Sequence, residues 1–212
     1  MSSPYLDLAG DSVPLEKVLG NGAALRTPLR YVWSSKYDVE ATIYSLQREQ
    51  NVYRRLHNPQ DACCDGVVCC TRFFAEATEL AYMVNGDLQL YLAYHPSCQQ
   101  QQLEWRVLVA DISTQNFLVD SDLPLKLCDF SEASLLPEDT NMELVDDHDY
   151  TAQVDIGPLG AVMFEVVAGK KVDLLPITDD IWLGHIIERC FTSQLSSAQS
   201  LLKALTSANP PP

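Results

Sequence analysis

The sequence feature that most constrains the fold is an apolar hairpin with an acidic residue close to each of its ends. Asp111 precedes the first predicted strand, residues 117–120, and Asp129 directly follows the second, residues 125–128. The two strands of a hairpin lie side by side, so the segments that enter and leave it meet at one end. The sequence therefore predicts that these two carboxylates are brought to the same place.

Apolar periodicity predicts both helices and strands elsewhere. Apolar residues recur at near-helical spacing in residues 39–56, which predicts a helix. Residues 155–168 are apolar on nearly every side, which predicts a helix buried nearly all round. Shorter helices are predicted at residues 88–94, 181–191 and 196–205. Strands are predicted at residues 66–74, 78–84 and 107–109, with a second hairpin over residues 13–25. This mixture predicts an α+β fold.

Composition limits the partners and the compartment. The chain is 47% hydrophobic and 20% charged, and no apolar run is long enough to span a bilayer, so we expect no membrane partner. Its net charge of −15 would be repelled by a phosphate backbone, so we expect no nucleic acid. The first ten residues lack the pattern of a signal peptide, and the cysteine count of seven is odd. We therefore expect buried thiols and a cytoplasmic or nuclear location.

The residues around the hairpin match a catalytic pattern. Asp111 with Asn116 five residues later, and Asp129-Phe130 after the hairpin, resemble the H-R-D-x-x-x-x-N and D-F-G motifs of protein kinases, most closely the divergent kinase-like proteins of fungi. The resemblance implies that Asp111 orients and deprotonates the substrate hydroxyl. It also implies that Asn116 and Asp129 hold Mg²⁺ against the phosphates of ATP.

Further segments follow in the order found in protein kinases. Residues 154–160 resemble the D-x-W-x-x-G start of a buried helix, in which Asp155 would anchor the backbone of the catalytic loop. Residues 47–53 resemble the regulatory helix, with Glu49 at the ion-pair position, and residues 80–88 resemble the interlobe hinge. The nucleotide-binding positions implied by the resemblance are Gly10, Arg26, Glu49, Ala81, Met83 and Asp87.

The resemblance also implies an architecture. It covers residues 8–206 and implies a single two-lobed domain over residues 1–212. Residues 5–84 would form a small β-rich lobe, residues 85–206 a mostly helical lobe that lacks part of its helices, and residues 207–212 a tail.

Four substitutions separate the chain from the kinase pattern. Gly10 is the single glycine where G-x-G-x-x-G is expected, and side chains there keep backbone amides away from phosphates. Arg26 puts a planar fork in place of the compact ammonium of lysine. Ala110 replaces the arginine that receives a phosphorylated activation loop, and Ser131 replaces the glycine of D-F-G, which stiffens that turn. We therefore expect weak ATP binding.

The largest departure is a missing helix between residue 94 and Asp111. Trp105 leads almost directly into the catalytic loop, and residues 170–180 are shortened as well. A buried helix contributes several apolar side chains, each worth about 1.5–3 kcal/mol, against a net stability of about 5–15 kcal/mol. Either the remaining elements rearrange, or the sequence is a truncated product, for example of mis-splicing or of an incorrect gene prediction. We expect weak or no phosphotransfer to serine or threonine, the alternative being a non-catalytic pseudokinase that binds proteins.

A long acidic segment bears on partners. Between Lys126 and Lys170 the chain has no Lys or Arg and many carboxylates. The segment is either a solvated acidic loop or a docking surface for a basic protein or peptide. The oligomeric state is not predicted.

Short motifs also suggest two other kinds of site, an esterase active site and a zinc site. Gly10-Asp11-Ser12 matches the short nucleophile motif of GDS-type esterases, but Trp182 stands where an Asp should orient His185. The doubled cysteines, at residues 63–64 and 69–70, suggest zinc, yet their spacing is not that of a zinc finger. Buried thiols are the simpler interpretation.

Overall fold

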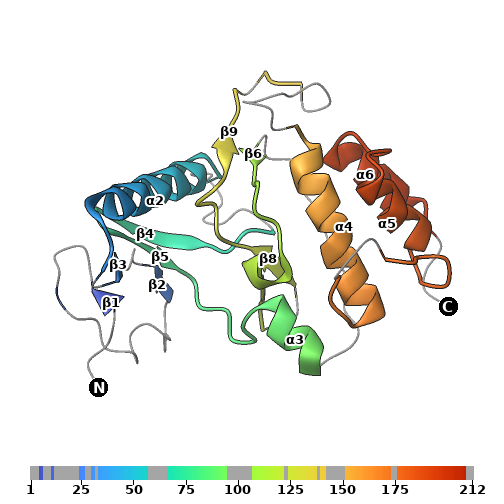
Figure 1. The fold of residues 1–212 in the computed structure, drawn as a ribbon, viewed down its shortest axis with the longest axis horizontal. Helices are drawn as coiled ribbons and strands as arrows, with labels where there is room; N and C mark the ends of the chain where they lie inside the picture. Colours follow the sequence, from blue (N-terminus) through green and yellow to red (C-terminus); the bar gives the residue numbers. More distant parts are fainter. Residues whose placement is uncertain are drawn as a thin grey trace.

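The computed structural model describes residues 5–6, 11, 24–26, 30–31, 33–56, 66–94, 107–121, 124–137, 139–141, 151–172 and 176–208. Among these residues the chain forms five α-helices and small antiparallel sheets, so the fold is α+β as predicted. In Figure 1 a sheet and helix α2 occupy one half of the molecule, and helices α4, α5 and α6 gather in the other.

A three-stranded sheet with the order β2-β5-β4 forms the first half. Its strands are β2 (Ala24–Arg26), β4 (Cys70–Phe74) and β5 (Ala77–Leu80). A separate pair joins β1 (Tyr5–Leu6) to β3 (Arg30–Tyr31). The strand predicted over residues 78–84 ends at Leu80, and the chain then runs without regular structure to Gly86, whose φ is 70°.

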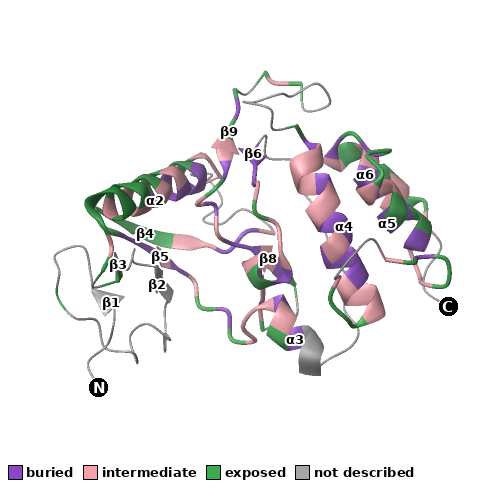
Figure 2. Ribbon diagram, in the orientation of Figure 1, coloured by how far each residue is buried: buried purple, intermediate pink, exposed green. Residues whose placement is uncertain are grey.

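Helix α2 (Lys36–Leu56) packs beside this sheet. It begins three residues before the predicted start because Ser35 and Asp38 cap it reciprocally, Ser35 N donating to Asp38 Oδ2 at 2.7 Å and Asp38 N to Ser35 Oγ at 3.2 Å. Gln50 Nε2 donates to the carbonyls of Phe74 and Ala77 at 2.9 and 3.0 Å, which ties the helix to the β4–β5 turn. The outward face of α2 is exposed (Figure 2).

The predicted hairpin lies in the middle of the molecule. Strands β7 (Phe117–Val119) and β8 (Leu125–Leu127) pair antiparallel, which confirms this hairpin. Around it lie α3 (Leu88–Tyr94), the single-turn 3₁₀ helix η1 (Thr114–Asn116), and the paired strands β6 (Val107–Leu108) and β9 (Ser134–Leu135). Helix α3 has the predicted bounds.

Three helices complete the fold: α4 (Gln153–Ala168), α5 (Gly184–Phe191) and α6 (Ala198–Thr206). No residue of α4 is exposed and six of its sixteen residues are buried, which agrees with the prediction of a helix buried nearly all round (Figure 2). Gly160 lets α5 approach, because a Cβ there would lie 2.6 Å from Cys190 Cβ. Helix α5 begins three residues later than predicted, after turns at residues 179–183.

Some predictions fall on residues that the structure does not describe. These are most of the 13–25 hairpin, the junction at Trp105 and the acidic residues 142–150. Among the described residues, no helix is both long and apolar enough to cross a bilayer.

Candidate functional site

The loop that follows β6 is held by one carboxylate on α4. Asp155 accepts hydrogen bonds from Val109 N at Oδ2 and from Ala110 N at Oδ1, both at 2.8 Å. Ala110 has a φ of 63°, a left-handed conformation that costs a non-glycine residue about 1–2 kcal/mol. Burial raises the pKa of Asp155, and the two backbone hydrogen bonds oppose that rise. The first turn of α4 therefore fixes the backbone next to Asp111.

Asp111 and Asn116 lie in contact on this loop. Asn116 Nδ2 donates to Asp111 Oδ2 and to the Asp111 carbonyl, each at 3.0 Å. Asn116 is half-buried and Asp111 is exposed. Because the amide nitrogen is used in this way, the amide oxygen is the atom through which Asn116 would hold a cation.

The backbone brings Asp129 next to this pair. Cys128 N donates to the Asn116 carbonyl at 2.8 Å. Asp129 has a φ of 65°, and its Oδ1 accepts from Ser131 Oγ at 2.7 Å and from Ser131 N at 3.3 Å. The next side chain, Phe130, is fully buried and meets the ring of Tyr53 edge-on at 5.2 Å. The two loops at the open end of the hairpin are thus joined through their backbones.

The two residues expected to form an ion pair lie on α2 and β2, and both of these elements contact β5. Glu49 is 2% exposed, and its charge acts on Cys70 at the start of β4. Arg26 lies on β2 opposite Thr78 of β5, but its side chain is outside the described residues. Gly10 is also outside them, so the expected phosphate clamp and ion pair stay predictions.

The expected hinge residues link the sheet to the hairpin. Ala81 N donates to the Cys69 carbonyl at 2.8 Å, and the carbonyl of the buried Met83 accepts from Gly86 N at 3.1 Å. Asp87 forms a backbone bridge with Leu118 on β7. Its Oδ1 accepts from Leu90 N at 2.8 Å and so caps α3. Asp87 therefore has a structural role, and the nucleotide contact that the resemblance implies for it stays a prediction.

One supporting contact of the site was not predicted. Thr114 Oγ1 donates to Glu165 Oε2 at 2.9 Å and ties η1 to α4. The signal in the sequence was Glu165 itself, a lone acid in the apolar run at residues 159–168. A carboxylate in such a run needs a polar partner.

The expectation that every cysteine is a thiol is wrong for Cys69, which is disulfide-bonded. Cys70, Cys128 and Cys190 are thiols. A disulfide depends on which Cβ atoms the fold brings within about 4 Å, and neither cysteine count nor spacing reveals that distance.

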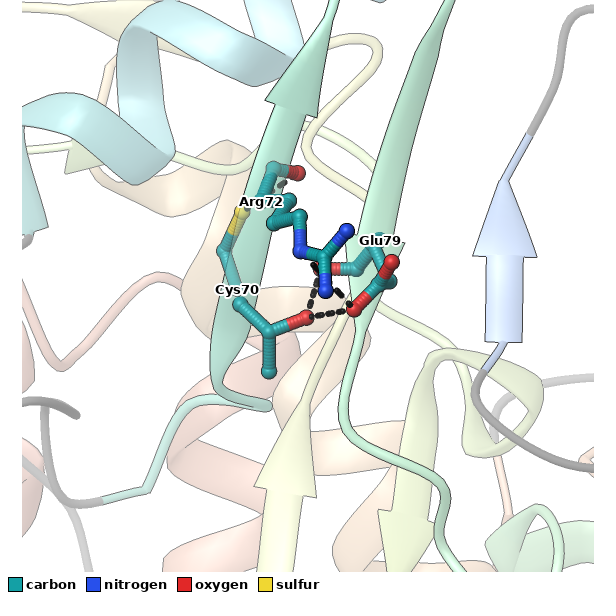
Figure 3. Close-up of polar contacts among 4 residues, drawn as sticks. Cys70, Arg72 and Glu79 are labelled. Carbon is teal, nitrogen blue, oxygen red and sulfur yellow. Dashed lines mark hydrogen bonds and ion pairs between the residues drawn. The ribbon is translucent and has the colours of Figure 1, made fainter.

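Strand β4 beside Cys69 carries polar contacts to β5 (Figure 3). Thr71 Oγ1 donates to Glu79 Oε1 at 2.7 Å, and Arg72 Nε lies 4.0 Å from the same oxygen. Cys70 Sγ contacts the Arg72 carbonyl at 3.6 Å, and burial is the main cause that raises the pKa of Cys70 to about 11. Cys70 is therefore a protonated thiol at neutral pH.

A pocket of about 360 Å³ lies away from the hairpin, beside the start of α5. It is lined by Thr178, Asp179, Glu188 and Ala208, together with the five residues from Ile181 to His185. Ser12, the nucleophile of the esterase hypothesis, is outside the described residues. The pocket includes none of the kinase-like positions.

The donor set at the hairpin is compatible with magnesium. Within the described part of the chain, no three His, Cys, Asp or Glu side chains gather as a metal-binding group. Mg²⁺ is commonly held by one or two carboxylates together with substrate phosphates, and does not need such a group. Asp129 and the amide oxygen of Asn116 have the oxygen ligands that it prefers.

Comparison with known proteins adds no relative. No protein-family model matches the chain, and no curated protein matches it. Function is therefore inferred from the site residues themselves.

Proposed function

We propose that this chain is a protein-kinase-like domain that binds ATP and Mg²⁺ weakly and transfers phosphate to protein serine or threonine poorly or not at all. The observation that carries this proposal is the pair of hydrogen bonds from Val109 N and Ala110 N to Asp155. The resemblance implies this anchoring contact, and its partners are 45 and 46 residues apart. Sequence spacing alone would not bring them together.

The arrangement of elements supports the interpretation of the fold as two lobes. The sheet β2-β5-β4 with α2 would be the small lobe, and α3 to α6 would belong to the large one (Figure 1). Residues 81–87 would be the hinge, because they leave β5 and are bonded to β7 at Asp87.

In this proposal each site residue has a defined role in phosphoryl transfer. The oxygen of the protein hydroxyl bonds to the γ-phosphorus of ATP while the bond from that phosphorus to the ADP oxygen breaks, and Asp111 accepts the hydroxyl proton. Mg²⁺, when bound, neutralises charge on the phosphates. Asn116 and Asp129 would hold it, and Asp155 keeps the loop of Asp111 in place.

The expectation of weak activity rests on the substitutions in the proposed small lobe. A phosphate clamp with the single glycine Gly10 gives few close backbone contacts. Misplacement of the reacting atoms by about 1 Å can lower a rate by roughly 10²-fold.

A non-catalytic interaction module is the second candidate. It is favoured because Asp87 Oδ1 and Asp129 Oδ1 already accept hydrogen bonds within the protein.

A binding assay tests the proposal before any activity is needed. The melting temperature would be measured with ATP and Mg²⁺, and with ATP and EDTA, for the wild type, Asp129→Asn and Asp139→Asn. The exposed Asp139 is the matched control, because it loses the same charge outside the site. We expect Mg²⁺-dependent stabilisation in the wild type and in Asp139→Asn, and its loss in Asp129→Asn.

A transfer assay with γ-³²P-ATP separates the two candidates. Trace labelling that disappears in Asp111→Asn supports a weak enzyme, and no labelling with intact nucleotide binding supports the non-catalytic module. Robust labelling would contradict the expected weakness, and the absence of nucleotide stabilisation in the wild type would refute the kinase-like proposal itself.

A further inference from the structure

The residue after Phe130 bonds directly to a proposed metal ligand. Ser131 Oγ donates to Asp129 Oδ1 at 2.7 Å, and Ser131 N approaches the same oxygen at 3.3 Å. A carboxylate oxygen has two lone-pair positions, so these two donors use the acceptor capacity of Oδ1. The hydroxyl makes the shorter of the two contacts, and hydrogen bonds to a charged acceptor are the stronger kind. A cation that binds through Oδ1 therefore competes with the two Ser131 donors for these positions.

The backbone conformation of Ser131 does not depend on its hydroxyl, so the effect of the hydroxyl can be tested by itself. The residue with positive φ in this turn is Asp129, at 65°, and Ser131 is not among the residues with positive φ in the described part of the chain. The expectation that serine stiffens the turn through an unusual φ of its own is therefore not supported at Ser131. Alanine fits this backbone equally well, so its substitution removes the hydroxyl and little else.

The surroundings keep Asp129 next to Ser131. Phe130, between them, is fully buried against Tyr53, and Cys128 N is bonded to the Asn116 carbonyl. The backbone on the N-terminal side and the side chain between the two residues are thus both held. A shift of the turn therefore does not separate the carboxylate from the hydroxyl, and a cation at Oδ1 competes with the serine bond.

We propose that the Ser131 hydroxyl competes with the divalent cation for Asp129 Oδ1 and thereby lowers the affinity of this chain for Mg²⁺ and nucleotide. This inference rests on the proposed function, because it takes Asp129 as a metal ligand. On cation binding the O–H···O bond is exchanged for a metal–oxygen contact, and the hydroxyl turns to water. Ser131 is a positioning residue that acts through Asp129.

The test is the dissociation constant of Mg²⁺ with the non-hydrolysable analogue adenylyl-imidodiphosphate, measured by calorimetry. We expect Ser131→Ala to bind about tenfold more tightly, a change of about 1.4 kcal/mol, since one hydrogen bond to a charged group no longer opposes binding. Ser131→Thr retains the hydroxyl and should bind like the wild type. Ser134→Ala, which removes a half-buried hydroxyl on β9, is the matched control and should also be unchanged.

Binding of Mn²⁺ alone, followed by electron paramagnetic resonance, gives a second readout that needs no nucleotide. The same order of affinities is expected there. If Ser131→Ala binds as the wild type does, or more weakly, while Asp129→Asn abolishes binding, competition is refuted and the proposed function stands. If neither the wild type nor Ser131→Ala binds cation or nucleotide, both proposals fall.

Discussion

Helices α4 and α5 pack so closely at Gly160 that a single methyl group there should destabilise the fold. An alanine at position 160 would place its Cβ 2.6 Å from Cys190 Cβ and 3.5 Å from both Cys190 Sγ and the Ile187 carbonyl. Carbon atoms pack at about 3.5–4.0 Å, so the helices would have to separate by roughly 1 Å. Cys190 is fully buried, so the strain cannot be relieved into solvent. Such overpacking costs about 1–3 kcal/mol.

A matched control lies on the same helix. At Gly157 a Cβ would meet Gln153 Nε2 at 3.6 Å, an ordinary contact. Both Gly→Ala changes gain about 1 kcal/mol of helix propensity. The propensity gain is common to both changes, and the following Pro158 disfavours a Cβ on a helical residue 157, which narrows the difference. Gly160→Ala should therefore be less stable than Gly157→Ala by up to about 3 kcal/mol. At roughly 2–4 °C per kcal/mol for a chain of this size, the melting temperatures should differ by several degrees.

The assay is urea unfolding followed by circular dichroism, with the slopes compared to confirm that the transitions are equivalent. A double variant, Gly160→Ala with Cys190→Ala, should not recover the lost stability, because the clash is with the Cβ of residue 190, which alanine retains. Equal stability of Gly160→Ala and Gly157→Ala would refute this reading of the α4–α5 contact.

Two further predictions concern α4 and α6. Burial gives Asp155 a folded-state pKa above its ordinary value of 3.8, so the folded chain holds this proton more tightly than the unfolded chain. The stability of the wild type relative to Asp155→Asn should therefore fall as pH rises from about 4 through the raised pKa, and then level off; a rise in urea titrations across this range would contradict the assignment. Ser197, whose side chain accepts from Ser200 N at 3.2 Å, caps α6, so Ser197→Ala should cost about 1 kcal/mol in the same assay. The exposed Ser196→Ala should be neutral, and equal effects at both positions would exclude the cap.

Local patterns predicted the elements better than the contacts between them. Helix α3, the β7–β8 hairpin and the burial of α4 follow from apolar spacing, which is set by near neighbours. The pairing of β6 with β9 and the bond from Thr114 to Glu165 join residues 26 to 51 positions apart, and the apolar periodicity of each segment does not predict such contacts. Cys69 was expected to be a thiol, and its disulfide was missed for the same reason.

Within the candidate site, the sequence predicted which loops meet but not the hydrogen bonds that their side chains form. The hairpin predicted that the loops of Asp111 and Asp129 meet, and the bond from Cys128 N to the Asn116 carbonyl joins those loops. Ser131 was noticed as a substitution, but its bond to Asp129 depends on a side-chain conformation that the sequence does not specify. The same holds for Asp87, whose role in capping α3 is visible in the structure alone.

The hold of Asp155 on the loop before Asp111 has a consequence for the order of folding. The left-handed Ala110 is supported by a helix that begins more than 40 residues later in the chain. Closing so long a loop is entropically unfavourable, so the strained turn gains this support only after α4 has docked. We infer that the turn matures late, after the transition state, so that loss of the Asp155 contact would speed unfolding more than it slows folding. The nascent chain would then acquire its candidate catalytic geometry as one of its last steps.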